Sequence, residues 1–142
     1  MFAVIRIKGS VGVKKDTEYT LELLRLHRKN HCVLLKEDGN VKGMLQKVKD
    51  YVSWGEIDNE ILKKLIEKRA RKIGDEKITD EEAKHILTGI HAGKNLQSLN
   101  IKPVFRLTPP SKGFKKSIKQ HYPNGELGYR GKEINDLLKR MI

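Results

Sequence analysis

Hydrophobic positions in the first 57 residues alternate between short apolar runs and stripes at helical spacing. The β-branched or apolar runs at 2–7, 32–35 and 51–54 predict three buried strands. Leucines within 16–26 follow a possible cap at Asp16, and the apolar residues of 41–48 recur at i, i+3, i+4 and i+7. Both patterns predict amphipathic helices, the second with Asn40 as its cap. The predicted order is therefore β-α-β-α-β.

Beyond residue 57 the pattern changes, because two helical stripes follow one another without a strand between them. The first predicts a helix over 58–73 that a Gly-Asp pair ends, and the second a helix over 80–90. Thr79 and Glu82 precede the second stripe at the spacing of a capping box. We therefore expect 58–101 to be a helical insert.

The last part of the chain, 102–142, combines an irregular segment with a clear final helix. Residues 104–107 predict one more short strand, and 134–141 repeat the helical spacing. The chain is thus predicted to have three parts: an α/β core at 1–57, the helical insert at 58–101, and a basic extended segment with a C-terminal helix at 102–142.

The charge of the chain changes this picture, because it is large and unevenly placed. There are 30 Lys and Arg against 18 Asp and Glu, for a net charge of +12. Residues 1–36 hold eight basic and three acidic residues, and 102–132 hold eight and one, whereas 37–101 hold twelve of each. A segregated basic excess is typical of a protein that binds a polyanion such as RNA, DNA or an acidic membrane surface.

The second basic block, 102–132, is also rich in Pro and Gly and contains aromatic rings between its cations. This composition predicts an extended, irregular segment that becomes ordered on RNA, although a disordered basic tail is the alternative. Cations beside rings that can stack on unpaired bases are typical of RNA recognition. The candidate RNA-binding residues here are Arg106, Lys112, Lys115, Lys116, Lys119, His121, Tyr122 and Arg130.

The first basic block supplies five further candidates around the first predicted helix. Lys14 and Lys15 follow a Gly-rich turn at the predicted helix start. Backbone N–H groups at a helix N-terminus can also bind phosphate. Arg25, Arg28 and Lys29 cluster at the helix end, where cations also favour the helix dipole. Ordinary solvated or helix-stabilising roles remain open for all five.

Catalytic and metal-binding chemistry finds little support in the sequence. Cys32 is the single cysteine, so no intramolecular disulfide is possible, and His27, His31 and Cys32 lack the spacing of a four-ligand zinc site. The Gly-rich turn is not a nucleotide-binding P-loop. No stretch has the length of a membrane span. We therefore expect a soluble cytoplasmic protein with no cofactor, no metal and no small-molecule substrate.

The residues that carry a family resemblance span nearly the whole chain. Phe-Ala-Val-Ile-Arg-Ile-Lys-Gly at 2–9, the leucine-rich 21–35 and Asn-Val-Lys-Gly-Met-Leu-Gln at 40–46 resemble the universal large-subunit ribosomal protein thirty, called protein seven of the large subunit in eukaryotes. Phe-Arg-Leu-Thr-Pro-Pro-Ser-Lys-Gly-Phe-Lys at 105–115 and Gly-Glu-Leu-Gly-Tyr-Arg-Gly-Lys at 125–132 are similar to its long form. The chain begins at the first strand, which favours the archaeal type.

This resemblance implies an α+β fold related to the ferredoxin-like fold, with a three-stranded antiparallel sheet. It implies binding to large-subunit ribosomal RNA, neighbouring ribosomal proteins as partners, a place in the cytoplasmic ribosome and no enzymatic activity. Two alternatives stay open. One is an RNA-modifying enzyme. The other is a non-ribosomal RNA- or DNA-binding regulator, for which the 58–73 helix offers a basic end at Lys63, Lys64, Lys68, Arg69, Arg71 and Lys72.

Overall fold

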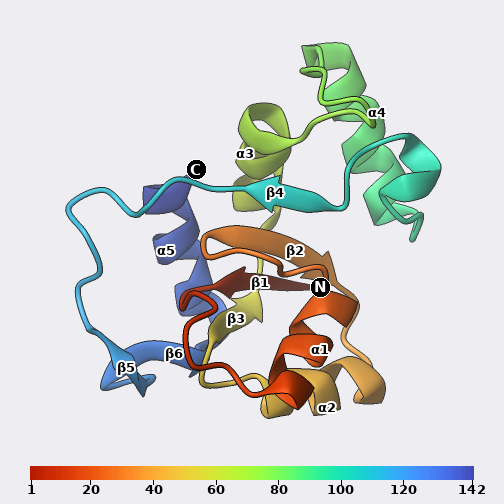
Figure 1. Ribbon diagram of the computed structural model, residues 1–142. Coiled ribbons are helices and arrows are strands. Elements are labelled where there is room, and N and C mark those ends of the chain that lie inside the picture. Colours follow the sequence, from red (N-terminus) through yellow and green to blue (C-terminus); the bar gives the residue numbers. More distant parts are fainter.

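Six strands form one mixed sheet with helices on both faces in the computed structural model, which describes residues 1–142 (Figure 1). The sheet order is β4-β2-β1-β3-β6-β5. The strands are β1 (Phe2–Arg6), β2 (His31–Leu35), β3 (Val52–Glu56), β4 (Val104–Arg106), β5 (Ser117–His121) and β6 (Gly125–Tyr129). The helices are α1 (Lys15–Leu23), α2 (Gly39–Lys47), α3 (Asn59–Arg69), α4 (Asp80–His91) and α5 (Ile134–Met141), with 3-10 turns at Gln97–Leu99 and Gly131–Glu133.

Strand β1 lies at the centre of the sheet and divides the core in two. Its side chains alternate between the faces, as the period of a strand requires. Ala3 and Ile5 join a large cluster with α3, α4 and α5, whereas Phe2 and Val4 join a smaller one with α1 and α2. Every residue of β1 is buried, so the sheet is covered on both faces.

The α+β class predicted from the sequence is confirmed, but the three-stranded sheet is not. Strand β1 pairs antiparallel with β2 and with β3, which are the three predicted strands. The sheet continues on both sides, because β4 adds antiparallel to β2 and β6 adds parallel to β3. Strand β5 lies beyond β6 with irregular pairing. An unpaired strand edge is a template for further strands, and the C-terminal part of the chain occupies both edges.

The expectation of an irregular segment over 102–132 is therefore wrong for much of its length. Both β5 and β6 lie inside it, joined by a turn at Tyr122–Asn124. Leu127 of β6 is 1% exposed and belongs to the large core cluster. The Pro and Gly residues mark turns here, while burial of Leu127 makes the segment part of the sheet.

Two of the predicted helix caps are wrong and one is confirmed in altered form. Asp38, rather than Asn40, caps α2 by accepting a hydrogen bond from the Val41 N–H at 2.8 Å. Asp16 lies inside the first turn of α1, where its charge favours the helix dipole. Thr79 caps α4 by accepting from the Glu82 N–H at 3.3 Å, and its hydroxyl donates to the Glu82 carboxylate at 3.2 Å.

Arg6 is fully buried, which the sequence pattern did not indicate. Its Nη1 donates to the Leu26 carbonyl at 2.7 Å and its Nε to the Lys8 carbonyl at 2.9 Å. Its Nη2 lies 3.7 Å from a carboxylate oxygen of Glu18 on α1. Buried charges persist when they are paired and hydrogen-bonded in this way. Arg6 therefore joins β1 to α1 and the turn after it, and is not available to a ligand.

Gly55 of β3 is needed for the close approach of the chain before α5. A Cβ atom at this position would overlap the carbonyl oxygen of Gly131 and lie 3.1 Å from the Cβ of Ile134. We expect Gly55→Ala to lower the free energy of unfolding by about 2 kcal/mol, the usual cost of overpacking a core. Urea unfolding followed by the fluorescence of Trp54 measures this loss.

The matched control is Gly43→Ala on the exposed face of α2. No atom lies within 4 Å of the Cβ that this change adds. Alanine is the better helix former, so this variant should gain about 0.5 kcal/mol or more. Equal stability of the two variants would show that the approach at Gly55 is not tight.

Candidate nucleic-acid interface

The pairing of β2 with β4 brings the two basic blocks of the sequence together. His31 and Arg106 are opposite each other in the register of these strands. Arg28 is adjacent, since its carbonyl accepts from the His31 N–H at 3.3 Å. Burial lowers the pKa of His31, and the nearby charges of Arg106, His27 and Arg28 lower it further. The field at this edge of the sheet is therefore positive.

Next to this edge, four cations surround a single carboxylate in a surface cleft of about 310 Å³. Lys102 and Arg106 form ion pairs with Asp75 at 3.2 and 3.7 Å. The hydrogen bond from Lys102 holds the pKa of Asp75 below its usual value, with help from the charges of Arg106 and Arg71. We call this site the basic cleft, and define it by Arg69, Arg71, Lys102 and Arg106 around Asp75.

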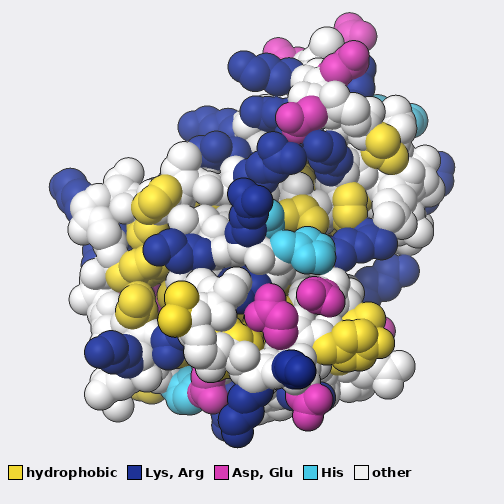
Figure 2. All heavy atoms as spheres, in the orientation of Figure 1, with side chains coloured by type: hydrophobic (Ala, Val, Ile, Leu, Met, Phe, Trp, Pro, Cys, Tyr) yellow, Lys and Arg dark blue, Asp and Glu magenta, His cyan; other side chains and the backbone are white.

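The space-filling view shows the same concentration of charge over one face of the molecule. Lys and Arg side chains gather over α3 and β4 beside His side chains, whereas Asp and Glu lie at the end near α4 and in the lower half of the view (Figure 2). The first turn of α4 holds Asp80, Glu81 and Glu82. Residues 37–101 therefore have no net charge only because an acidic surface on α4 offsets a basic one, and the basic one contributes Arg69 and Arg71 to the basic cleft.

Chemically, the basic cleft fits phosphate groups. Arginine presents a planar set of donors that matches phosphate oxygens in a bidentate manner. Asp75 holds Lys102 and Arg106 in place without neutralising the site, since four positive charges meet one negative charge. Of these four cations only Arg106 was among the sequence candidates. The sequence pointed to Arg69 and Arg71 only as part of the basic helix end of the DNA-binding alternative, and it gave no indication of Lys102.

The candidates Lys112, Lys115, Lys116 and Lys119 all lie exposed on β5 and the loop before it. Tyr122 lies beside them, with the Lys116 ammonium 4.8 Å and the Arg130 guanidinium 5.7 Å from its ring centroid. Such cation–π contacts order the lysine and the ring together. We call residues 112–130, which include β5 and β6, the basic hairpin. It lies apart from α3 and β4 in Figure 1.

Two sequence candidates at the basic hairpin are engaged inside the protein. Arg130 has a side chain 9% exposed and forms an ion pair of 2.7 Å with the buried Glu126. His121 forms a contact of 2.8 Å with the Asp50 carboxylate, which anchors β5 to the turn before β3. The Nε2 of His121 and the Nη1 of Arg130 thus have partners in the fold, whereas the buried Nε of Arg130 has none.

The candidates of the first basic block lie around α1. Lys14 precedes the helix, Lys15 begins it, and both are exposed. Lys29 is exposed on the turn that leads to β2, as is Arg28. None of these four side chains has an intramolecular hydrogen bond or ion pair, which leaves all of them open to solvent.

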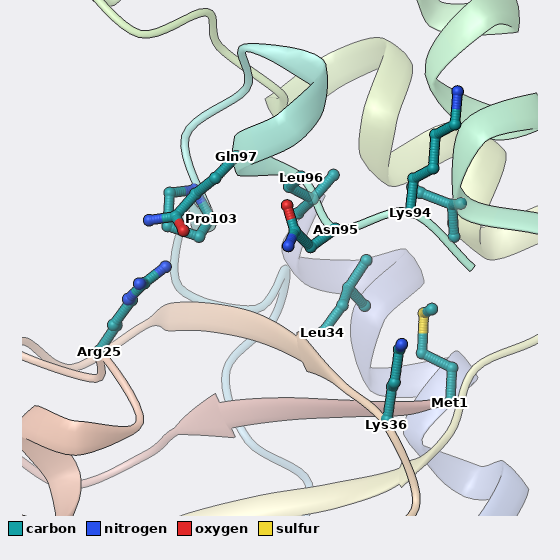
Figure 3. Close-up of a pocket in the computed structure, with 10 residues that line it drawn as sticks. Met1, Arg25, Leu34, Lys36, Lys94, Asn95, Leu96, Gln97 and Pro103 are labelled. Carbon is teal, nitrogen blue, oxygen red and sulfur yellow. The ribbon is translucent and has the colours of Figure 1, made fainter. Parts of the chain in front are cut away.

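Arg25 instead faces a pocket of about 190 Å³ between β2 and the connector that follows α4. Figure 3 shows Arg25 extending toward Gln97 and Pro103, with Leu34 and Leu96 between them and Lys94. With the Gln97 amide oxygen turned toward it, Arg25 donates at 2.9 and 3.0 Å. The pocket combines cations, amides and an apolar floor.

Other chemistry is weakly supported. No group of three or more His, Cys, Asp or Glu side chains is arranged to hold a metal ion. Burial raises the pKa of the Cys32 thiol to about 12, so it is not a nucleophile at neutral pH. None of the helices has the length and apolar character needed to cross a membrane.

Comparison with known proteins gives a consistent result. The family model described as ribosomal protein L30p/L7e matches residues 2–52. Proteins named large ribosomal subunit protein uL30 match over nearly all of this chain and of their own length. The protein of Thermoplasma volcanium is 49% identical over 100% of this chain and 93% of its own. Those of Nanoarchaeum equitans and Archaeoglobus fulgidus are 46% and 47% identical, covering 100% and 99% of this chain and 99% of each relative.

Proposed function

The chain belongs to the uL30 family of large ribosomal subunit proteins, and from this membership we propose that it is a structural constituent of the large subunit that binds ribosomal RNA. Its place is then the cytoplasmic ribosome, and its partners are ribosomal RNA and neighbouring ribosomal proteins. It acts as a scaffold and not as an enzyme. The observation that carries the RNA-binding part is the basic cleft.

The basic cleft is proposed to hold the phosphate backbone of folded RNA. Its cations come from α3, the loop after it, the segment before β4 and β4 itself, so the fold sets their spacing before RNA arrives. Preformed sites lose less side-chain entropy on binding than free lysines do. Arg28, next to His31 of β2, extends the positive surface toward that strand, which lengthens the track that RNA can follow.

The basic hairpin and the cations around α1 are proposed as further contacts. In the basic hairpin the four lysines are free for phosphate, and the half-buried Tyr122 offers an edge or face to an unpaired base. Lys14, Lys15, Arg25, Arg28 and Lys29 remain predicted contacts as well. His121 and Arg130 support these contacts best by holding β5 and β6 in place, and a direct contact to RNA from either remains a prediction.

The division of the chain is also proposed. Residues 1–57 make the core related to the ferredoxin-like fold, and the family model's match to 2–52 supports treating them as one unit. The insert 58–101 adds α3 and α4, and 102–142 adds both outer edges of the sheet together with α5. On this proposal the additions supply all four cations of the basic cleft: Arg69 and Arg71 come from the insert, and Lys102 and Arg106 from 102–142.

A competition experiment tests this function against the DNA-binding alternative. The full chain is bound to a labelled fragment of large-subunit ribosomal RNA, and unlabelled RNA or duplex DNA of equal length is added. We expect structured RNA to displace the label at much lower concentration than DNA. Equal displacement by DNA would favour a regulator of general nucleic-acid affinity instead.

A further inference from the structure

A second pocket lies where β1, β3 and β6 face α2, away from the basic cleft. It has a volume of about 310 Å³. Its walls combine three aromatic rings with two carboxylates and one ammonium group: Phe2, Trp54, Tyr129, Glu37, Glu56 and Lys42. Three of the eight aromatic residues of the chain thus line one pocket.

The rings form a contiguous wall. The ring centroids of Phe2 and Tyr129 are 6.3 Å apart in an edge-to-face arrangement, and those of Trp54 and Tyr129 are 6.2 Å apart. Trp54 and Phe2 are 4% exposed, whereas Tyr129 is 49% exposed. Two rings therefore fix the third, whose open surface faces the pocket.

One carboxylate of this pocket lacks a cationic partner, although the protein as a whole is basic. Glu56 accepts a hydrogen bond from the Tyr129 hydroxyl at 2.5 Å and has no ion-pair partner. Glu37 pairs with the N-terminal amine at 3.2 Å, and Lys42 lies within 4 Å of neither carboxylate. The hydrogen bond to Glu56 raises the pKa of Tyr129, and the charges of Glu56 and Glu37 add to this effect. A chain of net charge +12 thus keeps a carboxylate without a cationic partner beside three aromatic rings.

We propose that this aromatic-acidic pocket binds the guanidinium group of an arginine on an extended basic segment of a neighbouring protein. A guanidinium group stacks on aromatic faces, and its planar donors match the two oxygens of a carboxylate. The aromatic rings and the carboxylates of the pocket can therefore bind the same group. Lysine is less suited, because its compact ammonium group is more strongly hydrated and cannot stack as a plane.

RNA is disfavoured as the occupant by the same charges. A base stacked on Tyr129 would bring its phosphates toward Glu37 and Glu56, where like charges repel. The proposal extends beyond RNA binding, since it gives the scaffold a protein-binding site on a different surface. Loss of RNA affinity and loss of arginine binding are therefore separable results.

Trp54 reports on this pocket directly, because it is the only tryptophan of the chain. The full chain is titrated with a capped peptide of alternating Gly and Arg, and with the same peptide carrying Lys or the neutral isostere citrulline in place of Arg. We expect a saturable change in Trp54 fluorescence with the Arg peptide, a weaker response with Lys and none with citrulline. Equal responses to Arg and citrulline, or the same response to a single-stranded oligonucleotide, overturn the proposal.

Variants locate the binding. Glu56→Gln keeps the shape of the pocket and an acceptor for Tyr129. It should lower the affinity for the Arg peptide by about tenfold, because a charge-assisted hydrogen bond is lost. Lys42→Ala should raise the affinity for the Arg peptide, because it removes a positive charge from the pocket. Glu60→Gln on the exposed start of α3 is the matched control and should change nothing. If neither Glu56→Gln nor Glu60→Gln changes the affinity for the Arg peptide, the peptide binds elsewhere and the assignment to this pocket is refuted.

Discussion

Replacing the four cations of the basic cleft by glutamine should lower the affinity of the chain for a large-subunit ribosomal RNA fragment by about a hundredfold at roughly 0.1 M salt. The changes are Arg69→Gln, Arg71→Gln, Lys102→Gln and Arg106→Gln. Each phosphate contact that is lost also removes a released counterion. The slope of log affinity against log salt should therefore become shallower by about 3.

A control with the same net charge separates this site from charge in general. Lys63, Lys64, Lys84 and Lys139 are all exposed, and their change to glutamine removes four positive charges outside the cleft. This control should lose affinity by a few-fold at most. If both quadruple variants weaken binding to the same extent, RNA responds to total charge and the basic cleft has no special role.

Glu126→Gln should lower the free energy of unfolding by about 3 kcal/mol, because it leaves the charge of Arg130 buried without a partner. Glu126 is 1% exposed, and one of its oxygens accepts from the Lys116 N–H at 3.0 Å while the other pairs with Arg130 at 2.7 Å. Glutamine keeps the size and the first contact but not the charge. Chemical denaturation at neutral pH measures the loss.

The double variant Glu126→Gln with Arg130→Met tests whether the pair acts as a unit. Removing both charges should restore most of the stability, because replacement of a whole buried pair is often close to neutral. A double variant as unstable as the single one would mean that Arg130 stabilises the hairpin by packing alone. RNA affinity of the double variant, measured at a temperature where it is folded, then reports whether Arg130 also contacts RNA.

Much of the fold could be predicted, because local spacing reflects which side of an element faces the core. The i, i+3, i+4, i+7 pattern in 41–48 and 134–141 matches α2 and α5 closely. Strands β5 and β6 could not be found this way. Strand β5 is exposed at every position, and β6 contains two glycines in five residues. They are strands because β3 has a free edge that β6 fills, and tertiary pairing overrides local propensity.

The candidate site shows the same limit. Arg106 and the lysines of the basic hairpin were predicted from a local excess of charge. Arg69 and Arg71 belong to a neutral stretch, because the sum over residues 37–101 includes the acidic first turn of α4. In space the Lys102 N–H donates to the Arg71 carbonyl at 2.9 Å, and an antiparallel bridge between Lys72 and Ile101 keeps these two distant segments together. Charge summed along the sequence therefore locates a charged surface only where residues that are close in sequence also lie on the same surface of the fold.

Chemical protection of the basic cleft tests the central claim most directly. The full chain is treated with an arginine-specific dicarbonyl and a lysine-acetylating reagent, free and bound to large-subunit ribosomal RNA, and modified positions are quantified by mass spectrometry. RNA should protect Arg69, Arg71, Arg106 and Lys102, while Lys63 and Lys64 on α3 stay reactive. Equal modification of the four cleft residues in the free and the RNA-bound chain would contradict the account.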